Sequence, residues 1–160
     1  MERLTEQPES IATIRFQDCD PYGHLNNGRY LNYLINARED HLIEHYNFNM
    51  YNYSQEHNST WVVSKNEILY KFPAKAFEKV LIRTQLIEYT DRKLKIEMVM
   101  FDESKKKLNA LLWMDMFFIN FKTQKLEKHN DDLMNLFKRV VLAIESPTIE
   151  DRAKRILRGK

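Results

Sequence analysis

The stretch at residues 16–33, FQDCDPYGHLNNGRYLNY, decides how this sequence folds. It holds two aspartates, a cysteine, a histidine, two adjacent asparagines and two of the chain's three glycines within eighteen positions. Alternating polar and apolar residues precede it, and apolar residues three or four positions apart follow it, so a strand ends and a helix begins there. A simple turn does not need so many hydrogen-bonding or reactive side chains. This corner is therefore the candidate functional site.

The helix that follows the corner is predicted over residues 28–46. The side chains that recur at three- and four-residue intervals are Leu31, Leu34, Ile35, Arg38, His41, Leu42 and Tyr46. Such a stripe has to pack against another element. We therefore expect this helix to lie on a sheet.

The sheet is predicted from one strand before the corner and four after it. The predicted strand segments are 11–16, 61–72, 78–89, 93–101 and 108–121, of which 11–16 and 93–101 alternate between polar and apolar residues. No helical pattern interrupts the last four, and strands with short connections favour an antiparallel sheet. Residues 47–60, NFNMYNYSQEHNST, have the composition of turns and are predicted to form a long loop.

Two helices are predicted after the last strand. Asn130 is placed to cap the first of them. The second is predicted to start at Ser146-Pro147, where a capping residue precedes proline, and it ends in the basic run RAKRILRGK. The chain of 160 residues is predicted to be a single domain, with a core at about 11–121 and a helical extension at about 130–160.

The segment ALLWMDMFFINF, residues 110–121, is apolar almost throughout. This is typical of a central strand that is covered on both faces of its sheet. One long helix covers only one face. We therefore expect the second face to meet a second copy of the chain, which predicts a dimer.

Composition excludes several classes of function. A net charge of +2 is too small to indicate nucleic acid as the main partner. The single cysteine, Cys19, allows neither an internal disulfide nor a cysteine-based zinc site. The amino-terminal residues begin with charge and contain no apolar h-region, and no apolar run approaches the ~20 residues of a membrane span. We therefore expect a cytoplasmic protein with no membrane insertion.

Asp18 and Asp20 are the paired carboxylates of the corner. An ionised carboxylate can attack an activated acyl carbon or take a proton from water. It can equally cap a turn, and that is the stronger interpretation for Asp18. Asp20 lies seven residues before Asn27, at the predicted helix start, where backbone N–H groups have no intrahelical partner and can hold a developing oxyanion. This spacing indicates an acyl-transfer site.

The other polar residues of the corner have alternative roles. His24 could shuttle a proton or orient a water, or it could be a hydrogen-bonded loop histidine. The side chains of Asn26 and Asn27 are predicted to be structural, because asparagine is a good helix cap, and the backbone N–H of Asn27 is the group of chemical interest. The two flanking carboxylates are expected to raise the pKa of Cys19, which argues against a thiolate nucleophile.

His41 and His45 are four residues apart on the predicted helix and resemble half of a zinc site. No third ligand is indicated, because Asp40 and Glu44 lie off their face of the helix. A polar helix flank is the favoured interpretation, and no metal site is predicted.

The pattern F-x-D-C-D-P-x-G-H-x-N-N-x-x-Y-L-x-Y, followed by a helix with Arg38, resembles the start of hotdog-fold acyl-CoA thioesterases. The similar proteins are the 4-hydroxybenzoyl-CoA thioesterase family and its broad acyl-CoA relatives. The resemblance extends to about Phe121 and implies an α+β fold in which an antiparallel sheet wraps around one long helix. The motif is fairly specific for the superfamily but not for a substrate.

The resemblance also implies roles for individual residues. Asp20 matches the family's catalytic aspartate, which acts as nucleophile or general base on the thioester carbonyl, and Asn27 matches the residue whose backbone N–H polarises that carbonyl. Arg92 and Lys93 fall where relatives place basic residues against CoA phosphates, although they also fit a solvated turn. The family's sites lie at dimer interfaces, so a homodimer or a dimer of dimers is expected. No metal or cofactor is implied, since CoA is part of the substrate.

Three functions remain open from the sequence. The first is hydrolysis of an acyl-CoA to CoA and a free carboxylic acid. The second uses the same chemistry on an acyl-carrier protein, for which the basic carboxy-terminal helix could supply a docking surface. The third is a hotdog dimer that binds acyl-CoA without turnover. The acyl group is not identified, because the abundant Met, Phe and Tyr residues fit either a fatty or an aromatic chain.

Overall fold

The computed structural model describes residues 3–159. Its strands are β1 (Glu9–Thr13), β2 (Ser59–Tyr70), β3 (Lys79–Tyr89), β4 (Lys93–Asp102), β5 (Leu108–Asn120) and β6 (Lys125–Leu126). Its α-helices are α1 (Tyr30–Tyr46), α2 (Met50–His57), α3 (Asp131–Val140) and α4 (Ile149–Arg158). The strands pair antiparallel in the order β1-β3-β4-β5-β2, and β6 pairs with β5. The predicted antiparallel sheet around one long helix is confirmed.

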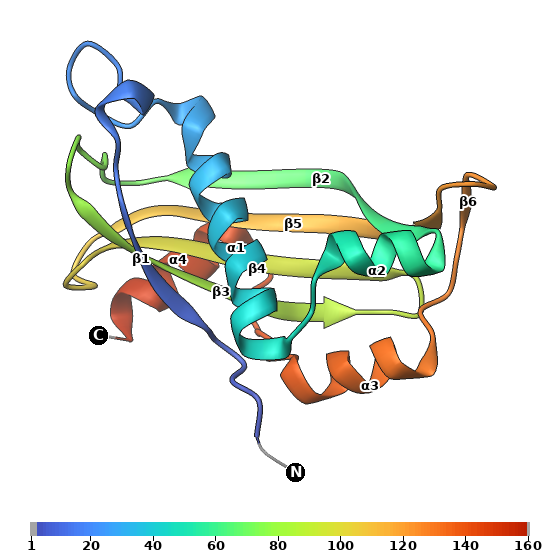
Figure 1. The fold of residues 1–160 in the computed structure, drawn as a ribbon. Helices are drawn as coiled ribbons and strands as arrows, with labels where there is room; N and C mark the ends of the chain where they lie inside the picture. Colours follow the sequence, from blue (N-terminus) through green and yellow to red (C-terminus); the bar gives the residue numbers. More distant parts are fainter. Residues whose placement is uncertain (1–2, 160) are drawn as a thin grey trace.

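Helix α1 lies across the concave face of the curled sheet (Figure 1). It follows a single 3-10 turn, Asn27–Arg29, and ends where Asn47 adopts a left-handed backbone with φ 50°. Its buried face carries Tyr30, Leu34, Ala37 and His41. The predicted helix over 28–46 is therefore correct to within two residues at its start, because the first turn is 3-10 rather than α.

The predicted ends of the strands are also close to those in the structure. The four strands after the corner match β2 to β5 with ends shifted by no more than two residues. The first strand ends at Thr13 rather than at residue 16, because residues 16–18 turn as a 3-10 helix. Residues 3–159 contain no helix with the length and apolar composition needed to cross a membrane.

The prediction of a long loop at 47–60 is wrong, because α2 occupies its centre. The turn-forming asparagines act at the two ends of this helix. The Asn49 side chain accepts a hydrogen bond from the Asn52 backbone N–H, and Asn58 ends the helix at φ 55°. Tyr53 of α2 packs on Trp61 with ring centroids 5.8 Å apart. Tertiary packing thus stabilises a helix of eight residues that is too short to persist alone.

The two carboxy-terminal helices are present, and one of the predicted caps is shifted. Asn130 caps α3 as predicted, since its side chain accepts from the Leu133 N–H. Helix α4 is capped by Thr148 instead of Ser146, because the Thr148 hydroxyl accepts from the Asp151 N–H at 3.1 Å. The helix therefore starts two residues after the Ser-Pro pair.

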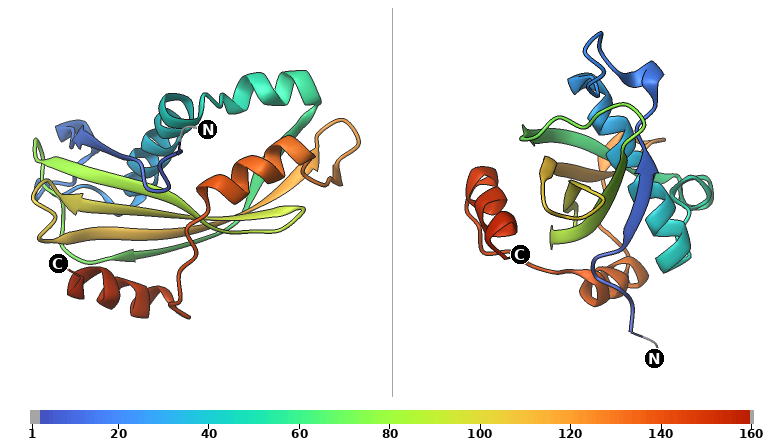
Figure 2. Two further views of the ribbon diagram at one scale, coloured as in Figure 1. Left: turned by 90° about the horizontal axis from the view of Figure 1, so that it is seen from below. Right: turned by 90° about the vertical axis from the view of Figure 1, so that its left-hand side faces the viewer.

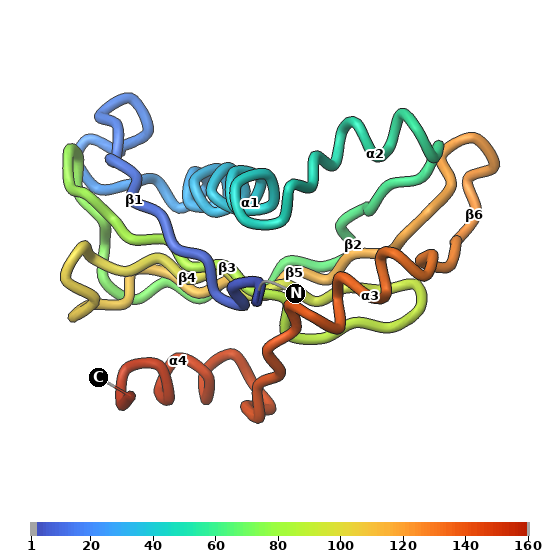
Figure 3. The backbone as a smooth tube through the Cα atoms, turned by 60° about the horizontal axis from the view of Figure 1, so that its bottom comes forward, coloured from blue at the N-terminus to red at the C-terminus, as the bar shows by residue number. Residues whose placement is uncertain are grey.

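Helix α4 covers the outer face of the sheet, opposite α1 (Figures 2 and 3). Its residues Ile149, Ala153 and Ile156 form a second buried cluster with side chains of the outer face. Those side chains are Ile87, Val99, Phe101, Leu108, Leu111 and Trp113. The continuous apolar pattern of residues 110–121 is therefore explained by the chain's own tail. The argument for a second copy on this face is wrong, and the dimer stays a prediction of the family resemblance.

A buried ion pair fixes α4 to the sheet. Arg152 donates two hydrogen bonds to the Glu97 carboxylate, at 2.8 and 2.9 Å, and Trp113 donates a third at 2.9 Å. Glu97 is 0% exposed. Because a buried charge is costly without partners, these three donors are what allow a carboxylate to lie between the sheet and α4.

Candidate functional site

The corner before α1 is built on a tight turn. Pro21 occupies the second position, and the Gly23 N–H donates to the Asp20 carbonyl at 2.9 Å. Gly23 has φ 76°, a conformation that favours glycine. One carboxylate oxygen of Asp20, Oδ1, accepts from the N–H groups of Tyr22 (2.9 Å) and His24 (3.1 Å). Asp20 therefore has the turn-stabilising role as well, but only through one of its two oxygens.

The second carboxylate oxygen of Asp20, Oδ2, accepts no hydrogen bond from any residue in the described range 3–159. The turn thus holds the carboxylate in a fixed orientation and leaves one oxygen for a ligand. Beside it, the Leu25 N–H donates to the Ala74 carbonyl at 2.8 Å, and both residues are buried. The corner is therefore attached firmly to the segment that follows β2.

A polar cleft of about 340 Å³ lies at this corner. The cleft brings together the three predicted catalytic residues, Asp20, His24 and Asn27. The remaining lining residues are Leu25, Asn26, Tyr30, Tyr70, Lys71, Phe72 and Pro73. The predicted juxtaposition of a carboxylate with the start of the long helix is thus present in the structure.

The helix start beside this cleft carries unpaired backbone donors. Asn26 is the residue before the 3-10 turn, and its side chain makes no capping hydrogen bond. Within the described part of the chain, the N–H groups of Asn27 and Gly28 have no acceptor. The Tyr70 hydroxyl donates to the Asn27 carbonyl at 3.0 Å and so fixes that peptide. Unpaired N–H groups at a helix start can stabilise negative charge on a ligand oxygen.

Asp18 has a structural role, but as an acceptor for the Tyr33 hydroxyl rather than as the turn cap that was favoured for it. The Tyr33 hydroxyl donates to Asp18 Oδ2 at 2.5 Å and accepts from the Arg15 N–H at 3.0 Å. Burial, and then the hydrogen bond with Asp18, raise the pKa of Tyr33. Asp18 does not line the cleft. It joins the start of the corner to the first turn of α1.

Cys19 is a poor nucleophile in this position. Its thiol donates to the Arg15 carbonyl at 3.4 Å. Burial raises its pKa, with the charges of Asp20 and Asp18 as further causes in the same direction. The expected effect of the flanking carboxylates is confirmed, and the thiolate is disfavoured.

The two histidines of α1 do not form a metal site. Both ring nitrogens of His41 lie 2.8 Å from hydroxyls, those of Thr84 and Ser10. Burial lowers the pKa of His41 to about 4, with the charge of Arg38 as the next cause. His45 is exposed. No group of three or more His, Cys, Asp or Glu residues within residues 3–159 could hold a metal ion.

Arg92 and Lys93 lie away from the cleft of their own chain. They follow the β3–β4 turn, where Lys93 pairs with Phe117 and Phe117 pairs with Val62 of β2. Tyr70, which lines the cleft, is eight residues further along β2, or about 26 Å. Arg92 makes an exposed ion pair with Asp91 at 3.3 Å. A single chain therefore does not bring these two cations to Asp20.

Sequence reasoning missed the aromatic wall of the cleft. Tyr70 and Phe72 come from the end of β2 and the residues after it, and Tyr30 packs against Tyr70 with ring centroids 5.2 Å apart. The alternation of β2 could have shown that Tyr70 and Phe72 share a face. It could not show that this end of β2 lies beside the corner.

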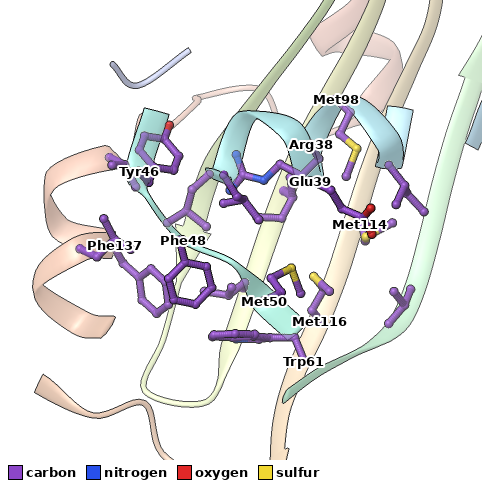
Figure 4. Close-up of a pocket in the computed structure, with 18 residues that line it drawn as sticks. Arg38, Glu39, Tyr46, Phe48, Met50, Trp61, Met98, Met114, Met116 and Phe137 are labelled. Carbon is purple, nitrogen blue, oxygen red and sulfur yellow. The ribbon is translucent and has the colours of Figure 1, made fainter. Parts of the chain in front are cut away.

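A second, apolar cavity of about 160 Å³ lies between α1, the sheet, α2 and α3 (Figure 4). Its walls include Trp61, Met98, Met114 and Phe137, and the side chain of Arg38 also faces it. We call this space the apolar cavity. It shares no lining residue with the polar cleft.

Comparisons with known proteins identify the family of this chain. The model of the thioesterase-like superfamily matches residues 14–138. A search of curated protein sequences finds no match. Among solved structures, the probable thioesterase YbaW from Escherichia coli is 26% identical, with 84% of this chain and 98% of that one covered and a TM-score of 0.72.

Two more distant structures share the fold. The DHNA-CoA thioesterase from Staphylococcus aureus is 18% identical, with 84% and 90% of the two chains covered and a TM-score of 0.75. The hypothetical protein SAV2348 from S. aureus, solved in complex with CoA, is 11% identical, with 92% and 93% covered and a TM-score of 0.76. The family match spans most of the chain, including the corner and the long helix. This chain therefore belongs to the thioesterase-like superfamily and is a thioester hydrolase with the hotdog fold.

Proposed function

We propose that the protein hydrolyses an acyl-CoA to CoA and a free carboxylic acid in the Asp20 cleft. The observation that carries this proposal is that Asp20 lines the same cleft as Asn27, whose backbone N–H has no acceptor within residues 3–159. A carboxylate beside oxyanion donors is the minimum that thioester hydrolysis requires. The DHNA-CoA thioesterase and the CoA complex among the similar structures support CoA as the carrier.

In this mechanism the thioester carbonyl oxygen points at the N–H groups of the helix start. Asp20 either attacks the carbonyl carbon or takes a proton from the water that attacks it. The C–S bond then breaks, and CoA leaves as a thiolate that takes up a proton, while water supplies the hydroxyl group of the acid. Each N–H donor that holds the oxyanion lowers the barrier by about 2.7–4 kcal/mol. His24 also lines the cleft, and its proposed role is to orient this water.

The complete site is proposed to form in a dimer that pairs through β2. This strand of 12 residues is an edge of the sheet, and its outer edge has no partner within residues 3–159. Val62 and Val63 on it are 39% and 46% exposed. A long edge strand with exposed apolar side chains is prone to pair with another chain. The family resemblance, in which sites lie between two chains, supports the same arrangement.

A two-fold axis near the middle of β2 has a consequence for the site. The strands run antiparallel across such an axis, so Tyr70 of one protomer lies level with the partner's Val62. Arg92 and Lys93 are level with Val62 in their own chain. The partner's Arg92 and the partner's Lys93 would then lie at the end of the sheet where the cleft opens, as the prediction that they bind CoA phosphates requires.

The structure offers less support for an acyl-carrier protein as donor. The basic helix α4 packs on the face of the sheet that is opposite α1 (Figure 3). Its residue Arg152 is already paired with Glu97. The 12:0-ACP thioesterase from Umbellularia californica, a similar structure that is 10% identical with a TM-score of 0.77, keeps this donor as the alternative. A cytoplasmic location stays a prediction from the sequence.

The test is thiol release from a panel of short, long and aromatic acyl-CoAs, compared with the same acyl groups on an acyl-carrier protein. We expect hydrolysis of at least one acyl-CoA, faster than that of its carrier-protein counterpart. Faster release from the carrier protein would favour the second donor. Binding of every acyl-CoA with no thiol release would establish a non-catalytic binding protein instead.

A further inference from the structure

The size of the apolar cavity limits what it can hold. Its volume is about 160 Å³, and an apolar cavity of ~150 Å³ is known to bind benzene. The space therefore fits a single six-membered ring or a chain of roughly six to eight carbon atoms. Four methionines line it, Met50, Met98, Met114 and Met116, and methionine side chains adapt readily to a ligand.

Arg38 is an unusual residue to line an apolar cavity, because its side chain is charged. Figure 4 shows its side chain among the apolar side chains, between Tyr46 and Met98. Its hydrogen-bond partners are neutral oxygens, Thr84 Oγ1 at 3.4 Å and the Tyr46 hydroxyl. No carboxylate in the described part of the chain lies within ion-pair distance of it. Burial lowers the pKa of Arg38, which reflects the loss of water around the guanidinium.

The other titratable groups around Arg38 do not neutralise it. His41 is neutral near pH 7, because burial lowers its pKa to about 4. The Tyr46 hydroxyl donates its proton to the Thr5 carbonyl at 2.8 Å. Glu39 also lines the cavity, but it is exposed and makes no ion pair with Arg38. A guanidinium with only neutral partners is a strong site for a ligand carboxylate or another anionic oxygen.

The position of the cavity connects it with hydrolysis. Along α1, Arg38 is eleven residues beyond Asn27, which is about 16 Å. A short acyl group held at Asn27 does not span that distance within one chain. In a dimer paired through β2, however, Tyr70 beside the cleft lies next to the partner's Val63, and Val63 lines the apolar cavity.

We propose that the apolar cavity receives a short acyl group, of about six to eight carbon atoms, which carries an anionic oxygen at its far end that Arg38 binds. This rests on the proposed thioester hydrolysis in the Asp20 cleft. The cavity sets the length of the acyl group, and Arg38 selects its terminal group. The substrate class is thus an acyl thioester whose far end is a carboxylate or a comparable oxygen anion.

Binding to the cavity can be measured without any thioester. The probes are hexanoate and hexan-1-ol, which differ in charge but little in size, and palmitate, which is too long. We expect hexanoate to bind about tenfold more tightly than hexan-1-ol, a difference of ~1.4 kcal/mol, and palmitate to bind more weakly than hexanoate. Methionine methyl NMR locates the site, since Met98 and Met114 should shift while Met100, which does not line the cavity, should not.

Arg38→Met tests whether Arg38 selects the anionic end of the ligand. Arg38→Gln replaces it in the same test if Arg38→Met does not fold. Both should abolish the preference for hexanoate over hexan-1-ol. The matched control is Glu39→Gln, which changes the next residue in the same wall and should keep the preference. The proposal would be overturned if the Arg38 variants kept the parent's preference for hexanoate. Equal binding of hexanoate and hexan-1-ol by the parent, or tighter binding of palmitate than of hexanoate, would also overturn it.

Turnover separates this proposal from the proposed function. We expect adipoyl-CoA, with its terminal carboxylate, to exceed hexanoyl-CoA in kcat/KM by about tenfold, and Arg38→Met to remove this ratio. Hydrolysis of both substrates without discrimination would refute the role of the cavity and leave thioester hydrolysis intact. Probe binding as expected with no hydrolysis of any acyl-CoA would refute the hydrolysis and leave the cavity as an anion-selective site.

Discussion

Asp18 and Asp20 show how the partners of a residue decide its role. The two carboxylates are two positions apart in one corner, yet the Tyr33 hydroxyl occupies an oxygen of Asp18, while Asp20 keeps one oxygen without a donor. The turn-stabilising interpretation of Asp20 applies to one of its oxygens, and the other oxygen is left for the proposed catalytic role. The residue types were readable from the sequence, but the hydrogen-bond partners were not.

Tyr33→Phe tests the structural role of Asp18. The substitution removes a donor to a partly buried carboxylate and should lower the free energy of unfolding by about 1–2 kcal/mol. It should change kcat little, since neither residue lines the cleft. Chemical denaturation and the thiol-release assay measure the two effects. A large loss of kcat in a variant of normal stability would contradict this assignment.

His41 should make stability depend on pH. Its pKa is lowered to about 4 in the folded protein, against 6.5 ordinarily. Between these values the unfolded chain binds a proton that the folded chain does not. The contribution of neutral His41 to the free energy of unfolding is therefore complete above pH ~6.5. As the pH drops from there towards ~4, the free energy of unfolding falls by up to about 1.4 kcal/mol per pH unit.

Denaturation by urea at about pH 7 and about pH 4.5 measures this dependence. His41→Gln keeps a hydrogen-bonding side chain that does not titrate, so its pH dependence should be shallower. The pKa of His129 is also lowered by burial, and this residue contributes in the same direction in both proteins. Identical slopes for the parent and His41→Gln would show that His41 is not the titrating group.

At the scale of elements, the carboxy-terminal tail is where the sequence misled most. The apolar pattern of β5 correctly indicated that both of its faces are covered, but the pattern does not say by what. Helix α4 is the cover, and its buried residues Ile149, Ala153 and Ile156 recur at helical spacing. Periodicity shows that a face is apolar, whereas the pairing of two apolar faces is a property of the tertiary fold.

Arg152→Met tests how α4 is held. The substitution leaves Glu97 charged and buried with one donor, Trp113, so it should lower the free energy of unfolding by about 3–5 kcal/mol. Combining it with Glu97→Gln removes the buried charge and keeps an acceptor for Trp113. This double variant should recover most of the stability in chemical denaturation. Equal losses in the single and double variants would mean that the ion pair itself is not what the single substitution disturbs.

At the scale of the whole molecule, the free edge of β2 predicts the assembly. Val62→Lys places a charged side chain in the apolar β2–β2 interface, opposite the partner's Tyr70, so we expect a monomer in light scattering and a large loss of acyl-CoA hydrolysis. The control is Ile11→Lys on β1, the other edge strand, where the parent side chain is 50% exposed. A dimer that persists in Val62→Lys, or one that dissociates equally in the control, would contradict pairing through β2.

Much of the molecule was predictable because local patterns decide it. Apolar or alternating segments bounded by turn residues predicted the four long strands, and three- and four-residue spacing predicted α1. The polar corner identified Asp20, His24 and Asn27 before their cleft was visible. Tyr70 and the apolar cavity were not predictable, since they depend on how distant segments pack. Helix α2 was missed because its capping asparagines look like turn residues.

The most direct measurement of the central claim is kcat for Asp20→Asn beside Asp18→Asn, on an acyl-CoA that the parent hydrolyses. If the free oxygen of Asp20 acts on the thioester at the start of α1, Asp20→Asn should lower kcat by at least ~100-fold, with the fold and assembly unchanged, and Asp18→Asn should do much less. Turnover by Asp20→Asn equal to that of the parent, or a greater loss in Asp18→Asn, would contradict the account.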